Sequence, residues 1–185
     1  MIEIRKYESK DKEYLRDICI ETSAFDVNAK NMKEFLCLMF NDYYTEVERD
    51  TCFVAVDEDD IPVGYLLCSK NYKEYEKVFN AFYQPEIDAL GLKYAFMSRG
   101  EKAVHKIFSK KYPSHLHIDL TEKCRRQGVG TRLISVLKED LKSKGLNSVM
   151  LSCGASNIPA VKFYEKNGFK TVKSLMGSNI MVLKF

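Results

Sequence analysis

The chain has 185 residues, of which 45% are hydrophobic and 30% charged, an ordinary composition for a globular protein with one domain over residues 1–185. Its formal net charge of +3 is small and dispersed, which argues against a nucleic-acid-binding protein. No apolar run approaches the ~18 residues of a membrane span, and the first residues lack the apolar core of a signal peptide. We therefore expect a cytoplasmic protein that binds neither nucleic acid nor membrane.

The six cysteines are not paired at metal-ligand spacing, so we expect no metal site. Without a secretion signal a disulfide framework is not expected either, and most of the thiols should be small buried groups. An accessible thiol stays possible at Cys124 or Cys153, although neither has an adjacent histidine that would mark it as a nucleophile.

Periodicity predicts the elements of the first third of the chain. They are a strand over 2–6, helices over 11–22 and 31–44, and strands over 51–56 and 62–68 that are joined by an acidic turn at 57–60.

The segment 71–114 reads as a helical insertion, in which five aromatic residues recur at helical spacing before Pro85 interrupts the pattern. A second helix is predicted over 100–110. Two interpretations are compatible: the aromatic residues pack on the core, or the insertion forms a lid or wall for a substrate. The aromatic residues are Tyr72, Tyr75, Phe79, Phe82 and Tyr83.

After the insertion, alternation predicts a strand over 115–120, and apolar spacing predicts a helix over 131–141. A strand over 148–152, a helix over 158–166 and strands near 169–172 and 180–183 complete the chain. Between the first of these strands and its helix lies Arg125-Arg126-Gln127-Gly128-Val129-Gly130. Glycines in a basic turn before a helix start form an anion site, because the backbone can approach the ligand and the helix amides point at it.

This Arg-x-x-Gly-x-Gly turn resembles the acyl-CoA-binding signature of the GNAT superfamily of N-acetyltransferases. The block from Asn157 to Phe169 is similar to the family's Asn-x-x-Ala-x-x-Phe-Tyr-x-x-x-Gly-Phe block. The resemblance implies a single α/β (α+β) GNAT-like domain with a mixed, mostly antiparallel sheet and helices on both faces. It also implies direct transfer of an acetyl group from acetyl-CoA to a primary amine, on a small molecule or a protein lysine, in a ternary complex.

By the same resemblance the turn and the first residues of the helix hold the pyrophosphate of acetyl-CoA. A backbone N–H of the strand that ends at Leu120 polarises the thioester carbonyl, and Asn157, the expected helix cap, also contacts the CoA arm. Tyr164 occupies the family's acid position, where its phenol would protonate the departing thiolate. The residues assigned to the pyrophosphate are Arg125, Arg126, Gln127, Gly128, Val129, Gly130 and Thr131.

The acceptor amine must lose a proton, because an ammonium with a pKa of ~10.4 is charged at neutral pH. His115, His117 and Asp119 share one face of their strand by its period of two. If this face lines the acceptor cleft, His117 is the better base, and the reaction rate should rise with pH around ~6.5. Asp119 would orient His117 or bind the substrate cation. A purely structural role for the pair stays open, as does deprotonation through water.

Within the family, Tyr112 to Asp119 resembles the acetyltransferase-like domain of O-GlcNAcases and its free-standing bacterial relatives. The alternative function is a catalytically silent acetyltransferase-like domain that binds CoA or a protein partner. Neither the acceptor nor the choice between monomer and homodimer is encoded in a recognisable motif.

Overall fold

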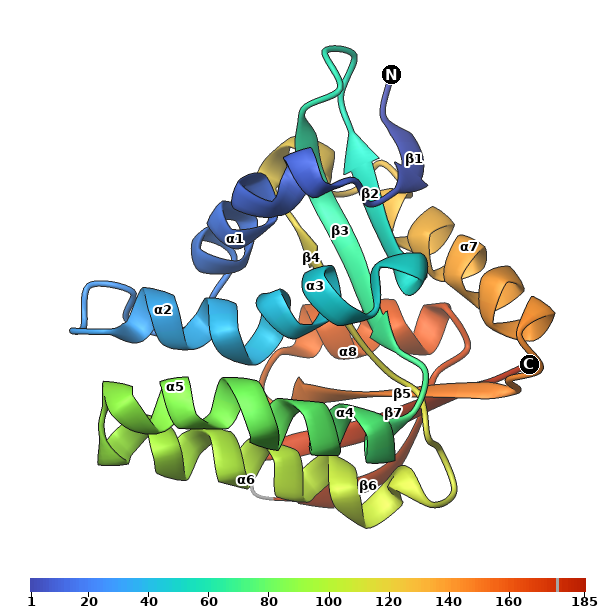
Figure 1. The fold of residues 1–185 in the computed structure, drawn as a ribbon. Coiled ribbons are helices and arrows are strands. Elements are labelled where there is room, and N and C mark those ends of the chain that lie inside the picture. The colour runs from blue at the N-terminus through green and yellow to red at the C-terminus, as the bar shows by residue number, and fades with distance from the viewer. Residues whose placement is uncertain (176) are drawn as a thin grey trace.

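The computed structural model describes residues 1–175 and 177–185 and contains a seven-stranded sheet in the order β1-β2-β3-β4-β5-β7-β6 (Figure 1). Neighbouring strands are antiparallel except β4 and β5, which are parallel, so the expected mixed, mostly antiparallel sheet is confirmed. The strands are β1 (Glu3–Lys6), β2 (Cys52–Val56), β3 (Pro62–Ser69), β4 (His115–Leu120), β5 (Ser148–Gly154), β6 (Lys170–Leu175) and β7 (Ser178–Lys184).

Helices cover both faces of the sheet, as expected (Figure 1). One apolar cluster joins the sheet to the helices that precede β4, and a second joins the opposite face to α7 and α8. Alternation along β2 produces this division, because Val54 faces the first cluster and Phe53 the second. The helices are α1 (Lys12–Glu21), α2 (Met32–Cys37), α3 (Tyr43–Val47), α4 (Tyr72–Val78), α5 (Gln84–Leu90), α6 (Leu92–Ser109), α7 (Val129–Ser143) and α8 (Ile158–Lys166). Within the described residues, no helix is both long and apolar enough to cross a bilayer.

The insertion is helical, but two of its predicted boundaries were wrong. Pro85 does not interrupt the first helix, because a π-helical segment over Phe79–Tyr83 links α4 to α5 and places the proline in the first turn of α5. There the missing proline N–H removes no regular helical hydrogen bond. The second helix, α6, begins at Leu92 rather than at Gly100.

Four of the five aromatic residues that the sequence singled out in the insertion, Tyr72, Tyr75, Phe79 and Tyr83, pack on the core, whereas the fifth, Phe82, is exposed. A second π-helical segment, Leu38–Asp42, links α2 to α3. It leads directly into Tyr43 and Tyr44, both of which are buried against the insertion.

The parallel pair β4 and β5 diverges almost as soon as it forms. Their register holds one pair of residues, His115 with Met150, and the Met150 N–H donates to Ser114 O over 2.9 Å. Beyond this point β4 stays paired with β3 and β5 with β7. The carboxyl half of β4 therefore has one edge free.

Gly64 in β3 sets how closely the end of β4 can approach. A Cβ at this position would lie 2.6 Å from Leu120 Cδ2 and 3.0 Å from Asp119 O. We expect Gly64→Ala to lower the free energy of unfolding by about 1–3 kcal/mol, because the backbone of β4 must move to relieve the overlap. Gly154→Ala is the matched strand control, since a Cβ there meets nothing within 4 Å. Equal stability of the two variants in urea denaturation would contradict this packing constraint.

Candidate active site

The basic turn lies between the end of β4 and the start of α7, as the sequence predicted. Gly128 precedes the helix with a φ of 73°, a left-handed conformation that favours glycine. A Cβ on Gly128 would meet nothing within 4 Å, so its surroundings are open. The first amides of a helix have no acceptor within it, and here the first internal bond of this region runs from Arg132 N to Gly128 O, at 3.0 Å. The N–H groups of Val129, Gly130 and Thr131 are thus oriented to bind an anion.

Gly130, the second glycine of the motif, contacts protein rather than open space. A Cβ on Gly130 would lie 2.7 Å from Phe163 Cζ and 3.1 Å from Leu120 Cδ1. Gly130 therefore allows α7 to pack closely on α8 and on the end of β4. The sequence predicted close backbone approach to a ligand at both glycines, whereas in the structure Gly130 faces protein.

The side chains of the turn are mostly tied to the protein or directed to solvent. Arg125 Nε donates to Leu120 O over 3.2 Å, and its guanidinium also pairs with Glu122. Gln127 Nε2 donates to Lys123 O over 2.7 Å. Arg126 and Thr131 are exposed. Of the predicted pyrophosphate ligands, the backbone amides are the groups that the fold orients most clearly.

The Leu120 N–H faces the gap left by the divergence of β4 from β5. Thr121 N donates to Val63 O over 3.0 Å, which directs that N–H toward β3. Because N–H groups alternate along a strand, the Leu120 N–H points away from β3, toward the free edge of β4. This is the placement that a donor to a developing oxyanion requires.

Helix α8 borders the same gap. Asn157 caps it, since its side chain accepts a hydrogen bond from Ala160 N at 3.2 Å, and the predicted cap is confirmed. Tyr164 packs its ring against Phe163 and Phe169, with centroids 5.3 and 5.6 Å away. Burial raises the pKa of the Tyr164 phenol above its ordinary value, and the phenol therefore keeps its proton at neutral pH.

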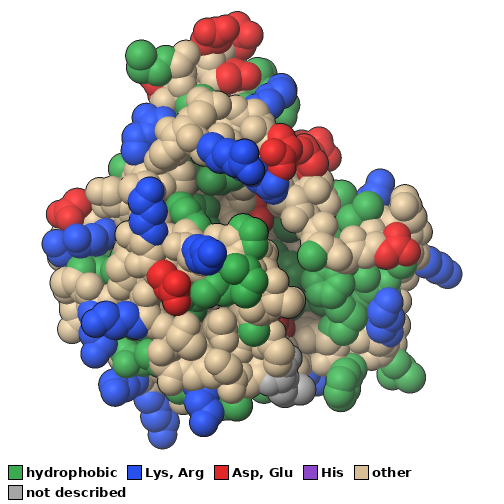
Figure 2. All heavy atoms as spheres, turned by 180° about the vertical axis from the view of Figure 1, so that it is seen from behind, with side chains coloured by type: hydrophobic (Ala, Val, Ile, Leu, Met, Phe, Trp, Pro, Cys, Tyr) green, Lys and Arg blue, Asp and Glu red, His purple; other side chains and the backbone are tan. Residues whose placement is uncertain are grey.

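On the other face of β4 lies a cavity of about 210 Å³, open to solvent. Figure 2 shows this side of the molecule hollowed between the surface of α8 and that of α1 and α2, with hydrophobic side chains along the hollow. His117 and Asp119 line the cavity, together with uncharged residues from α1, the loop after it, α2 and the π-helical segment Leu38–Asp42. These are Cys19, Thr22, Ser23, Ala24, Phe25, Leu36 and Phe40.

The two cavity residues that come from β4, His117 and Asp119, are held by tyrosines that sequence reasoning missed. Tyr65 donates to Asp119 Oδ2 over 2.6 Å, and the Tyr44 hydroxyl lies 3.1 Å from His117 Nε2. The ring of Phe40 lies edge-on to His117 with a centroid distance of 5.2 Å. Both tyrosines read as core residues in the sequence, because an aromatic residue in an apolar element carries no signal that its hydroxyl is used.

Burial shifts both titratable groups of this face toward their neutral forms. Desolvation raises the pKa of Asp119 above its ordinary value, although the Tyr65 hydrogen bond partly opposes this. Desolvation lowers the pKa of His117 to about 3. The rise of the reaction rate expected near pH 6.5 is therefore displaced to a much lower pH, because the desolvated imidazole resists protonation.

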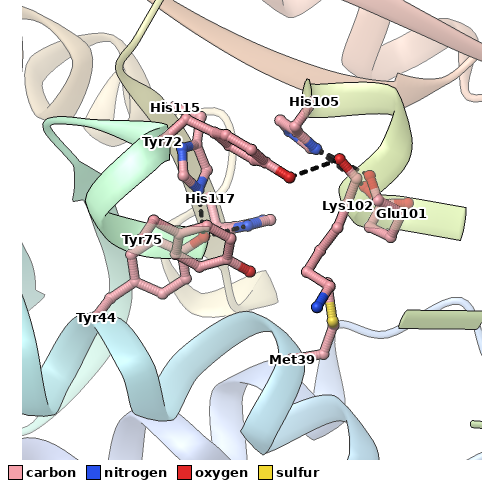
Figure 3. Close-up of a pocket in the computed structure, with 9 residues that line it drawn as sticks. All are labelled: Met39, Tyr44, Tyr72, Tyr75, Glu101, Lys102, His105, His115 and His117. Atoms are coloured by element: carbon pink, nitrogen blue, oxygen red, sulfur yellow. Dashed lines mark hydrogen bonds and ion pairs between the residues drawn. The ribbon is translucent and has the colours of Figure 1, made fainter. Parts of the chain in front are cut away.

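His115 shares the strand face, as predicted, but it lines a different space. Figure 3 shows it with Tyr44, Tyr72, Tyr75 and His105 around a cavity of about 10 Å³ inside the protein. His115 is buried, with Nε2 at 2.9 Å from the Tyr44 hydroxyl. His117 contributes to both cavities and separates them.

All six cysteines are free and buried. Desolvation raises the pKa of both Cys124 and Cys153, which removes the thiolate that a nucleophile requires. Neither is the accessible thiol that the sequence left possible. Among the described residues, no three His, Cys, Asp or Glu side chains gather in a group that could hold a metal ion.

Comparison with known proteins agrees with this architecture. A family model described as the acetyltransferase (GNAT) family matches residues 12–169. The chain belongs to the GNAT family of acetyltransferases. It is an N-acetyltransferase, as the sequence predicted, and acetyl-CoA is the cofactor that the family uses.

Three relatives illustrate the match. An N-alpha-acetyltransferase of Sulfurisphaera tokodaii is 32% identical over 118 residues, which cover 60% of this chain and 67% of the relative. The crystal structure of SsHAT superposes with a TM-score of 0.88 at 23% identity, covering 99% of this chain and 98% of that one. The paiA N-acetyltransferase from Thermoplasma acidophilum, solved in complex with coenzyme A, has a TM-score of 0.63 at 18% identity, with coverage of 100% and 99%. The two solved structures establish the shared fold.

The low pKa of His117 predicts how stability depends on pH. Below about pH 6.5 the unfolded chain binds a proton at this residue, whereas the folded chain does not until about pH 3. The free energy of unfolding should therefore fall by up to ~1.4 kcal/mol per pH unit as the pH drops through this window. His117→Gln should remove that contribution and give a shallower decline between pH 6 and 4. Parallel declines of wild type and variant in urea titrations would show that His117 is not held neutral.

Proposed function

We propose that residues 1–185 form one domain that transfers an acetyl group from acetyl-CoA to a primary amine by direct attack in a ternary complex. The observation that carries this proposal is the double role of β4. The free edge of the strand presents the Leu120 N–H to the gap beside α7 and α8, while its face presents His117 and Asp119 to the larger cavity. Cofactor and acceptor thus meet across one strand.

Acetyl-CoA would be held by its pyrophosphate at the start of α7. The amides of Val129, Gly130 and Thr131, with the positive end of the helix dipole, supply the anion site, and Arg126 and Thr131 add exposed side chains from the same turn. Arg125 would have to exchange Glu122 for the pyrophosphate, a small cost because both side chains are solvent-exposed. Asn157 and Tyr164 on α8 would border the CoA arm.

The reaction follows from these placements. Asp119 binds the incoming ammonium, and His117 accepts a proton from the amine at its Nδ1 atom, since its Nε2 is already bonded to Tyr44. The amine nitrogen attacks the thioester carbon while the Leu120 N–H stabilises the oxyanion. The C–S bond then breaks, and Tyr164, which keeps its proton at neutral pH, delivers it to the CoA sulfur.

The acceptor cavity favours an amine next to a compact apolar group. A volume of about 210 Å³ is below the ~300–1,000 Å³ of drug-sized sites, so only a short segment of the acceptor enters. Ala24, Phe25, Leu36 and Phe40 line it with apolar surface around one carboxylate, Asp119. A small monoamine, a lysine or a protein N-terminus can present such an amine. The relative from Sulfurisphaera tokodaii is named for the last of these classes.

The narrower assignment rests on the sequence from Tyr112 to Asp119. We propose on this basis that the chain is a free-standing relative of the acetyltransferase-like domain of O-GlcNAcases, acting as a monomer or homodimer. Six free cysteines suit a reducing compartment such as the cytoplasm. A thermal-shift assay with acetyl-CoA, followed by a free-thiol assay over an amine panel, tests the function. Binding without turnover on any amine would favour the catalytically silent alternative.

The anion site can be tested with a matched pair of substitutions at Gly128. Asp and Asn have the same shape and both tolerate a left-handed φ better than most residues, so they impose similar strain. Gly128→Asp places a negative charge beside the pyrophosphate and should weaken acetyl-CoA binding at least tenfold more than Gly128→Asn. Calorimetry that gives the two folded variants equal affinities would contradict a pyrophosphate at this turn.

Tyr164→Phe tests the acid. The turnover number should fall ~10²–10⁴-fold, the usual contribution of a general acid, while the dissociation constant of acetyl-CoA stays nearly unchanged. Tyr112→Phe is the control, because this buried tyrosine packs with Met150 and Val182 and does not lie on α8. If Tyr164→Phe lowers turnover by less than about threefold, another group protonates the thiolate.

A further inference from the structure

A chain of three rings, those of His117, Tyr44 and His115, connects the acceptor cavity to the interior cavity. The Tyr44 hydroxyl lies 3.1 Å from His117 Nε2 and 2.9 Å from His115 Nε2 (Figure 3). Tyr44 is fully buried, and its ring stacks on Tyr75 with centroids 6.0 Å apart. One hydroxyl therefore bridges two imidazoles that face different spaces.

The chemistry of a phenol couples the two histidines. A hydroxyl has a single hydrogen, so Tyr44 can donate to one imidazole and must accept from the other. The imidazole that donates carries its hydrogen on Nε2, and the imidazole that accepts carries it on Nδ1. His115 and His117 are therefore held in opposite tautomers, and a change at one requires the reverse change at the other.

The interior end of this chain has two nitrogens without a partner. His115 Nδ1 and His105 Nε2 are buried and make no hydrogen bond within residues 1–175 and 177–185. Their rings lie 5.2 Å apart at the cavity of about 10 Å³, which is room for about one water molecule. A water there would find two polar partners, which is what a buried water needs.

From His105 the path reaches the surface. His105 Nδ1 lies 3.3 Å from Glu101 O and 3.8 Å from Glu101 Oε1, and the Glu101 side chain is 31% exposed. Lys102 lines the same cavity, but its ammonium donates to Asn80 Oδ1 and Gln84 Oε1 at 2.5 and 2.6 Å. In Figure 3 its side chain extends away from His105, toward Met39.

We propose that Tyr44, His115, one water molecule and His105 form a proton relay that carries the proton of the acceptor amine from His117 to Glu101. This relay rests on the proposed function, in which His117 is the group that accepts the proton. It assigns a task to the insertion, because His105 and Glu101 both lie on α6.

Every step of the relay keeps the rings neutral. The amine N–H bond breaks as His117 Nδ1–H forms, and His117 Nε2–H breaks as its hydrogen passes to the Tyr44 oxygen. The Tyr44 hydrogen moves to His115 Nε2, and His115 Nδ1–H is released to the water. The water passes a proton to His105 Nε2, and His105 Nδ1–H passes one to the Glu101 carboxylate. After product leaves, proton exchange with solvent at both ends restores the first tautomers.

Neutrality is what the surroundings require. Desolvation lowers the pKa of His117 and of His115 and raises that of Tyr44, so neither imidazolium nor phenolate is stable here. When cofactor and acceptor fill the open cavity, solvent on that side is displaced. A concerted transfer through Tyr44 then removes the proton without charging a buried ring.

The resting protein provides a test that does not need activity. The chain has three histidines, so their imidazole nitrogens can be resolved by ¹⁵N NMR. His115 and His117 should show complementary tautomer populations, and Tyr44→Phe should abolish this complementarity. Tyr43→Phe is the matched control, because its neighbouring buried hydroxyl bonds Glu48 instead. Identical tautomers at His115 and His117 would overturn the relay.

Turnover provides the second test. Tyr44→Phe should lower the turnover number at least tenfold and leave acetyl-CoA affinity unchanged. A plot of the wild-type rate against the D₂O fraction (a proton inventory) should be curved, because several protons move together, and it should become linear in Tyr44→Phe. Glu101→Gln, which removes the terminal acceptor of the relay, should likewise reduce the solvent isotope effect, with folding checked by circular dichroism. Unchanged inventories in both variants would overturn the relay. A wild type that acetylates no amine would instead refute the proposed function, while the tautomer pattern would still decide the relay.

Discussion

The site depends on the separation of two parallel strands after a single paired position, His115 with Met150. A strand edge inside a sheet normally has its N–H and C=O groups paired, and unpaired backbone groups are costly when buried. Here the edge of β4 beyond His115 has no strand partner, so the N–H of Leu120 faces the gap, where we propose that it meets the thioester carbonyl. β3 pairs with the other edge over the whole of β4, which fixes the positions of His117, Asp119 and Leu120 relative to one another.

Close packing at two glycines borders this opening, and a third glycine turns the chain beside it. Gly64 brings β3 against the end of β4, Gly130 brings α7 against Phe163 and Leu120, and Gly128 turns the chain into the helix. At the first two positions a Cβ would overlap protein atoms, and at the third it would meet open space. Gly64 and Gly130 thus serve packing, whereas Gly128 leaves open space beside the helix start. The sequence alone does not separate these two uses of glycine, because they depend on which elements lie nearby.

Much of the fold could be predicted from the sequence, since periodicity and caps are local properties. β4 and α8 have the predicted bounds, and Asn157 caps α8 through Ala160 N. The predicted helix break at Pro85 was wrong, because the energetic cost of a proline in a helix depends on the preceding turn. Here the π-helical segment before Pro85 accommodates it. The predicted site residues cluster around β4, but whether they bind or react remains a prediction. Tyr44 and Tyr65 could not be found, because their importance lies in what their hydroxyls contact across the fold.

The magnitude of the His117 shift limits the order of events at the acceptor. An ammonium has a pKa of ~10.4, whereas desolvation holds the pKa of this imidazole far below its ordinary value, so complete transfer of a proton between them before attack is unfavourable. His117 therefore cannot store the proton as an imidazolium ion. In the proposed reaction the proton leaves as the new C–N bond makes the nitrogen acidic, and the relay carries it beyond the ring. A neutral imidazole with Nε2 already bonded to a hydroxyl is suited to that exchange, whereas a solvated histidine near pKa ~6.5 would be suited to holding the charge.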